Sequence, residues 1–171
     1  CIISSFKKQG YEAQFVYGGE SEFDNMKNYL MHNKFDQIID VASFERSLQE
    51  QKLGVSDKYV FDKMLEMNKK KKGPIFSLIL TQSTHEPYDI KVNKYVFDEA
   101  ERYLNAVRYL DQCLGDFFDR AKKEPWYSNT IFIITSDHAH LHPNNYAPSE
   151  VERLKIPLGI SCINFLSGYA M

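Results

Sequence analysis

Short apolar runs along the chain are separated by polar loops and by stretches with helical spacing. Two of the runs, residues 75–80 and 130–135, are almost continuously apolar, which is typical of strands buried on both faces of a parallel sheet. Residues 13–17, 37–40 and 156–160 carry shorter apolar runs and predict three further strands. The pattern therefore distributes strands over the whole length of the chain.

Helical spacing of apolar side chains fills most of the intervals between these strands. Ile2-Ile3 is an additional short strand signal that leads into a polar helix end. One helix is predicted for residues 21–31, and a second starts with Ser56 as its N-cap and stops before Gly73-Pro74. The longest covers about residues 97–122 and places its apolar side chains on a single stripe.

Strands that alternate with helices indicate an α/β domain with a mostly parallel sheet. In open sheets of this kind, functional loops lie beyond the carboxyl ends of the strands. Two polar loops follow the two most apolar strands, at residues 81–87 and 136–149. These loops are the places where chemistry is expected.

Composition narrows the function classes. The 171 residues suit one domain, and 43% of them are apolar, enough for a core. The net charge of −2 provides no basic stripe, which argues against nucleic-acid binding. The three cysteines are odd in number and far apart, so neither a zinc site nor a disulfide framework is expected. No apolar run reaches the roughly 18–20 residues of a membrane span.

Four of the five histidines fall in the two polar loops. His85 follows the first apolar strand, while His138, His140 and His142 follow the second, directly after Asp137. An aspartate oxygen and a neutral imidazole suit a divalent metal, and a turn at the strand end lets both converge on one ion. The alternative is that Asp137 caps the next turn and that the histidines are exposed on a loop.

The loop that contains His85 also carries Ser and Thr hydroxyls that suit a phosphate or sulfate oxygen. His85 could donate a hydrogen bond to that group or protonate a leaving group. The alternative is a polar connecting loop in which Pro87 sets the turn. A complete hydrolytic site is not visible, because two ligands leave a metal under-coordinated and no nucleophile elbow is present.

Five segments resemble the sulfatase-like family that includes lipoteichoic acid synthases and phosphoglycerol transferases. Their order and spacing agree with the family over most of the chain. The segments are FVYGGESEFDNM at residues 15–26, GVSDKYVFD at 54–62, PIFSLILTQSTHEPY at 74–88, NTIFIITSDH at 129–138 and KIPL at 155–158.

The resemblance implies a three-layer α/β/α sandwich around a mixed sheet, of which residues 1–171 are an incomplete, C-terminal part of one catalytic domain. It implies Asp137 and His138 as metal ligands, with manganese expected first and magnesium, calcium or zinc as alternatives. His85 matches a histidine that contacts the phosphoryl group of the substrate. His140 is expected to shape a substrate pocket together with His142, and exposed loop histidines are the alternative.

The family's nucleophile, a threonine or a modified cysteine, is expected upstream of Cys1 together with the first acidic metal ligand. No catalytic nucleophile is therefore assigned within this chain. This chain also differs from the lipoteichoic acid synthases at three positions. Where this chain has Tyr17, the synthases have a histidine, and around the positions of Asp24 and Met26 they have a tryptophan and an arginine. These three family residues grip glycerol phosphate, so the resemblance does not extend to that substrate.

The expected function is the hydrolysis or transfer of a sulfate ester or phosphodiester through a covalent intermediate. By the resemblance, the parent protein is membrane-anchored, its catalytic domain is extracytoplasmic (in the periplasm or on the outer face of the membrane), and its substrate is linked to a lipid or a glycan. The alternative is a non-catalytic α/β module whose loop histidines are structural or bind metal weakly.

Overall fold

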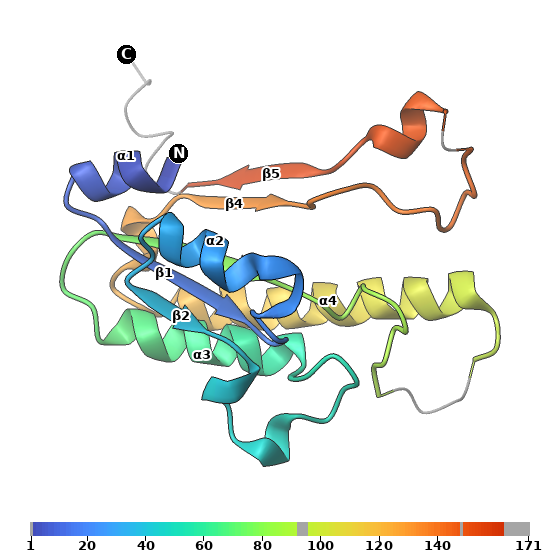
Figure 1. Cartoon of the computed structure of the whole chain (residues 1–171), viewed down its shortest axis with the longest axis horizontal. Helices are drawn as coiled ribbons and strands as arrows, with labels where there is room; N and C mark the ends of the chain where they lie inside the picture. The colour runs from blue at the N-terminus through green and yellow to red at the C-terminus, as the bar shows by residue number, and fades with distance from the viewer. Residues whose placement is uncertain (1, 92–95, 148, 163–171) are drawn as a thin grey trace.

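A computed structural model of the protein describes residues 2–91, 96–147 and 149–162. Helices and strands alternate up to α4, after which β4 and β5 complete the described part of the chain (Figure 1). The expected α/β class is therefore confirmed. No helix in the described ranges has both the length and the apolar character needed to cross a membrane.

A parallel sheet of three strands forms the centre, in the order β2-β1-β3. Its strands are β1 (Glu12–Tyr17), β2 (Gln37–Ile39) and β3 (Ile75–Leu80). Phe15 of β1 lies opposite Ile38 on one side and Leu78 on the other. Because β1 is central, four of its six residues are buried, and the strand carries the middle of the fold.

Two long helices cover one face of the sheet. They are α3 (Asp57–Lys69) and α4 (Glu99–Ala121), which lie along each other beneath the strands (Figure 1). Their apolar stripes meet in the main core, where the rings of Phe61 and Phe117 lie 5.2 Å apart. Val16 of β1 joins the same core. The helices predicted after Ser56 and at about residues 97–122 are confirmed.

Ser56 is the N-cap residue of α3, as predicted, but its side chain does not make the capping hydrogen bond. Its backbone is extended before the first turn of the helix. Its hydroxyl instead accepts a hydrogen bond from the Tyr109 hydroxyl at 3.1 Å. The contact ties the start of α3 to α4.

Two shorter helices lie on the opposite face, so the sheet has helices on both sides. They are α1 (Ile2–Lys8) and α2 (Met26–His32). Phe6, next to Lys7 in α1, packs its ring 5.0 Å from that of Phe76 in β3, and Leu30 of α2 is buried. This arrangement matches the expected α/β/α layering.

Two details of these short helices differ from the predictions. Ile2 and Ile3 belong to α1 and not to a strand, because the helical turn buries Ile3 and leaves Ile2 in solvent. The helix predicted for residues 21–31 is divided: Asp24 and Asn25 have positive φ angles of 50° and 59°. A 3-10 turn therefore precedes α2.

The last two strands differ most from the expected burial. β4 (Phe132–Thr135) pairs antiparallel with β5 (Leu158–Ser161) in a separate two-stranded sheet. Ile133 is 64% exposed and Ile160, its cross-strand partner, is 67% exposed. The prediction that residues 130–135 are buried on both faces is wrong for this chain, because no other described strand pairs with the hairpin. β3 is also partly open, with Leu78 41% exposed.

Candidate functional site

The loop after β3 is fixed at its first residues by a buried carboxylate. Asp57, at the start of α3, accepts backbone hydrogen bonds from Gln82 at 2.9 Å and Ser83 at 3.0 Å. The Gln82 side chain donates to the Val55 carbonyl at 2.9 Å. Asp57 has no exposed surface, and this burial raises its pKa above the ordinary value while the backbone N–H groups oppose the shift. The loop therefore leaves the sheet in a defined direction.

His85 lies farther along this loop, with its side chain exposed. Its Nδ1 is 2.7 Å from the Glu86 carbonyl oxygen. A carbonyl only accepts hydrogen bonds, so Nδ1 carries the proton and Nε2 remains available to a ligand. Donation from Nε2 to a phosphoryl oxygen then requires the imidazolium form.

Asp137 and His138 lie just beyond the end of β4, and their side chains are 75% and 72% exposed. Asp137 Oδ2 lies 3.7 Å from His138 Nε2. His138 Nδ1 donates to the Ala139 carbonyl at 2.8 Å, which leaves Nε2 with a free lone pair. Metal-binding histidines usually donate their other ring nitrogen to such a partner, so the pair has a geometry suited to metal.

Two observations limit what this pair does alone. Asp137 Oδ1 accepts the backbone N–H of the next residue, His138, at 2.9 Å, so one carboxylate oxygen is already hydrogen-bonded within the loop. Within residues 2–91, 96–147 and 149–162, no three His, Cys, Asp or Glu side chains are grouped so as to hold a metal ion. The pair can therefore supply two ligands of a metal centre and no more.

His140 is held in place by three contacts, although its ring also lines a pocket. Its ring stacks on Tyr103 of α4, with centroids 4.0 Å apart and planes 9° from parallel. Nδ1 accepts the backbone N–H of His142 at 3.0 Å, and Nε2 is 3.1 Å from the Tyr88 hydroxyl. Because Nδ1 accepts, the neutral ring carries its proton on Nε2 and donates it to Tyr88.

Burial accounts for the titration of this cluster. It lowers the pKa of His140, with a smaller contribution from the neighbouring His142. It also raises the pKa of Tyr88 to about 12, and the Glu86 carboxylate adds to that effect. Both shifts favour the neutral forms, so the His140–Tyr88 hydrogen bond joins two uncharged groups.

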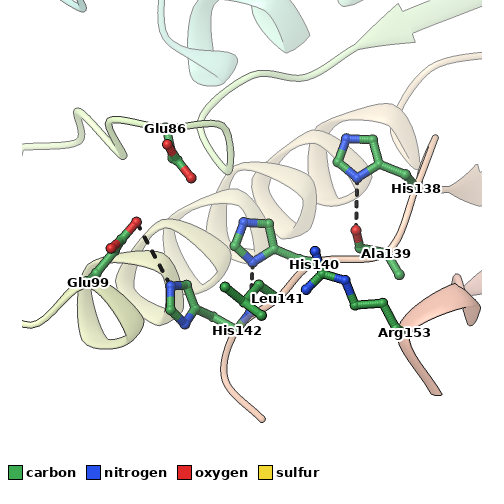
Figure 2. A pocket seen from close by; sticks show the side chains of 8 residues that line it. All are labelled: Glu86, Glu99, His138, Ala139, His140, Leu141, His142 and Arg153. Carbon is green, nitrogen blue, oxygen red and sulfur yellow. Dashed lines mark hydrogen bonds and ion pairs between the residues drawn. The ribbon is translucent and has the colours of Figure 1, made fainter. Parts of the chain in front are cut away.

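A pocket of about 330 Å³ opens beside these histidines (Figure 2). It is built by three segments: the loop after β3, the start of α4, and the chain between β4 and β5. In Figure 2, Glu86 and Glu99 lie on one side of His140, and His138 and Arg153 lie on the other. The lining residues are Glu86, Glu99, His138, Ala139, His140, Leu141, His142 and Arg153.

The structure thus brings His138 and His140 to one pocket. His85 is not among the residues that line this pocket, although the next residue, Glu86, is. Tyr103 and Arg153 were not singled out as site residues from the sequence. Tyr103 belongs to the apolar stripe of α4, so its stacking on His140 could not be distinguished from core packing. Arg153 had no motif around it that signals a site.

Comparison with known proteins agrees with this architecture. The sequence model of the sulfatase family matches residues 1–157. A lipoteichoic acid synthase of Staphylococcus aureus is 27% identical over 147 residues, which are 81% of this chain but only 23% of that protein. The chain therefore spans about a quarter of the length of this curated relative.

Three solved structures have similar folds. A protein of the alkaline phosphatase superfamily from Vibrio parahaemolyticus is 36% identical, with a TM-score of 0.78 over 95% of this chain and 41% of that one. The lipoteichoic acid synthase LtaP of Listeria monocytogenes has a TM-score of 0.82 at 16% identity, covering 96% and 46% of the two chains. The Streptococcus pyogenes phosphoglycerol transferase GacH, in complex with sn-glycerol-1-phosphate, has a TM-score of 0.62 at 15% identity, covering 90% and 44%. The family resemblance and the fold class expected from the sequence are both confirmed.

Proposed function

This chain belongs to the sulfatase family, and we propose that it is the C-terminal part of a catalytic domain that cleaves or transfers a phosphodiester or sulfate ester. The Asp137–His138 pair at the end of β4 is the observation that carries the proposal. Relatives named as a lipoteichoic acid synthase and a phosphoglycerol transferase support the same reaction class.

Asp137 and His138 are the residues that would hold a divalent metal ion. A hard carboxylate oxygen beside a neutral imidazole nitrogen fits manganese, and it also fits magnesium or zinc. Both side chains are mostly exposed, so no packed neighbour blocks approach to either. When bound, the ion supplies Lewis-acid polarisation of the phosphoryl or sulfuryl oxygen.

The nucleophile and the remaining metal ligands belong, in this proposal, to sequence upstream of Cys1. The chain covers only 23% of the Staphylococcus relative, which leaves room for these residues in a longer protein. The nucleophile's oxygen would form a bond to phosphorus or sulfur while the bond to the leaving alcohol breaks. Water or an acceptor alcohol would then release the covalently held group. His85 Nε2–H, in the imidazolium form, would donate to the phosphoryl oxygen or to the departing alcohol.

We also propose that the full-length protein is membrane-anchored, with this domain outside the cytoplasm and a lipid- or glycan-linked substrate. The relative that is named for synthesis of lipoteichoic acid, a lipid-linked polymer, supports this location. Protease accessibility in intact spheroplasts tests it: cleavage of the domain without lysis is expected, and full protection would contradict it.

Activity of the full-length protein tests the reaction class. With Mn²⁺, we expect turnover of bis(4-nitrophenyl) phosphate or 4-nitrophenyl sulfate, and a loss of about 100-fold or more in Asp137→Ala. Asp111→Ala, which changes an exposed residue of α4, is the matched control and should keep full activity. Residues 1–171 alone should show negligible turnover, and robust activity would overturn the upstream assignment of the nucleophile.

The second candidate is a non-catalytic α/β module. The hydrogen bond from the His138 N–H to Asp137 Oδ1 favours it, because the aspartate already has a partner within its own loop. The same assay separates the two functions: absence of turnover by the full-length wild type with Mn²⁺ would support the module, and turnover that Asp137→Ala abolishes would exclude it.

A further inference from the structure

The two loops that carry the proposed chemistry are not joined through a sheet in the described part of the chain. His85 follows β3, which belongs to the three-stranded sheet. Asp137 and His138, the proposed metal pair, follow β4, which belongs to the separate hairpin. A phosphoryl or sulfuryl group can contact His85 and the metal pair together only if the two loops keep a fixed distance. Contacts other than strand pairing must therefore set that distance.

Each loop contributes one ring to a cluster that lies close to its functional residue. Tyr88, three residues after His85, is only 4% exposed, and its backbone N–H donates to the His85 carbonyl at 2.9 Å. His140, two residues after His138, places its Nε2 3.1 Å from the Tyr88 hydroxyl. The two loops thus meet in a hydrogen bond between these two side chains.

Tyr103 of α4 contacts both of these rings. It stacks on His140 with centroids 4.0 Å apart, and it meets the Tyr88 ring edge to face with centroids 5.8 Å apart and planes 69° from parallel. Ala106, one turn further along α4, has no exposed surface, so the helix is anchored in the interior at this point. Tyr103 therefore presents a fixed surface against which both loops rest.

We propose that Tyr103 is a positioning residue that fixes the separation between His85 and the metal pair. It acts on them through Tyr88 and His140, the rings that it contacts in the two loops. The inference rests on the proposed function, because it needs the ester group to lie between His85 and the metal pair. Displacing one of two groups that act together by about 1 Å can cost roughly 100-fold in rate, so a residue that holds both loops affects the reaction without touching the substrate.

Kinetics of the full-length protein with Mn²⁺ test the inference on bis(4-nitrophenyl) phosphate or 4-nitrophenyl sulfate. Tyr103→Leu removes both ring contacts but keeps an apolar side chain, and we expect kcat to fall about tenfold with KM changed less than about threefold. Tyr103→Phe keeps the ring and should stay within about twofold of wild type. Leu110→Ala is the matched control, because it truncates a side chain of the same helix that packs against the core. It should lower the melting temperature at least as much as Tyr103→Leu and leave kcat unchanged.

A double-mutant cycle with His85→Ala separates positioning from a general loss of stability. If Tyr103 acts by placing His85, Tyr103→Leu should lower the kcat of the His85→Ala protein less than about twofold. The same loss in both backgrounds, or a wild-type kcat in Tyr103→Leu, would overturn the inference, and so would equal losses in Tyr103→Leu and Tyr103→Phe. A full-length Asp137→Ala protein that keeps wild-type turnover would instead overturn the proposed function, so the two failures are distinguishable.

Discussion

Asp57 places an ionisable group where water does not reach it. A buried carboxylate is costly unless hydrogen bonds compensate it, and here two backbone N–H groups of the loop after β3 do so. The side chain therefore couples the first turn of α3 to the loop that carries His85. A residue far from the pocket in sequence thus determines where one of its walls begins.

Replacing Asp57 by Asn tests this coupling. The amide NH₂ would face a backbone N–H, so one hydrogen bond is replaced by a donor–donor contact. We expect a loss of about 2 kcal/mol in the free energy of unfolding and faster amide hydrogen exchange at Gln82 and Ser83. Asp62 lies in α3, as Asp57 does, and forms a surface ion pair with Arg120 of α4. Asp62→Asn removes this pair and should cost less than about 1 kcal/mol. Unchanged exchange at Gln82 and Ser83 would contradict the role of Asp57.

The sequence could identify the chemical groups of the site but not their partners. Asp137, His138 and His85 are visible because they follow apolar strands and match a family motif. The stacking of His140 on Tyr103 is not visible, because it depends on how α4 lies against a later loop, and the two residues are more than thirty positions apart in the sequence. Assigning His85, His140, Asp137 and His138 to binding roles remains a prediction.

Among the elements, the turn before β2 is fixed by one side chain. Asp36 accepts a hydrogen bond from the Lys7 ammonium in α1 and another from the Ala13 N–H of β1 at 2.8 Å. The Lys7 hydrogen bond is the largest cause that lowers the pKa of Asp36. A lowered folded-state pKa means that the carboxylate stabilises the fold above its ordinary pKa, and that this contribution is lost as pH falls through the folded value.

Asp36→Asn should therefore destabilise the protein at pH 7 and not at low pH. We expect a cost of about 1 kcal/mol at pH 7, a value discounted for the partial exposure of both side chains. The cost should shrink as pH falls below the ordinary aspartate value of about 3.9. Urea unfolding of both proteins at pH 7, 5 and 3 measures it, with Asp111→Asn as control. A cost that stays constant over this range would show that the charge of Asp36 is not its cause.

Except at Ile2-Ile3, predicted as a strand and found in α1, strand and helix types followed from the local pattern, whereas burial did not. The apolar run at residues 130–135 correctly marks β4, because its side chains favour a pleated strand. It cannot state which partner covers the strand, since that partner is distant in sequence. The break in the helix predicted at residues 21–31 was missed for another reason. Asp24 and Asn25 adopt a left-handed backbone, which the spacing of apolar residues in this segment does not reveal.

At the scale of the whole molecule, the described residues form three layers on one side and an open hairpin on the other (Figure 1). Exposed apolar side chains gather on β4, on β5 and near their ends: Ile131, Ile133, Ile134, Ile156, Leu158 and Ile160. Patches of this kind mark interaction surfaces, and open strand edges favour pairing with other chains. The hairpin is thus the part of the chain that most needs a covering partner.

Residues 1–171 produced alone should consequently self-associate. Light scattering during size-exclusion chromatography should detect dimers or larger species at micromolar concentration. The double variant Ile133→Lys, Ile160→Lys should shift the population toward monomer by placing two like charges opposite each other. Met31→Lys, at an exposed position of α2, is the control and should leave association unchanged. A monomeric wild-type chain would contradict the prediction.

The affinity of the full-length protein for Mn²⁺ tests the assignment of Asp137 and His138 most directly. Isothermal titration calorimetry of wild type, Asp137→Ala and Asp111→Ala would compare the dissociation constants without depending on a substrate. We predict that Asp137→Ala weakens Mn²⁺ binding by about 100-fold or more. Loss of a residue that only supports a metal ligand weakens metal binding by about 10- to 100-fold, and loss of a ligand should cost at least as much. Asp111→Ala should bind Mn²⁺ as the wild type does. The same dissociation constant in all three proteins would contradict the metal centre proposed at the end of β4.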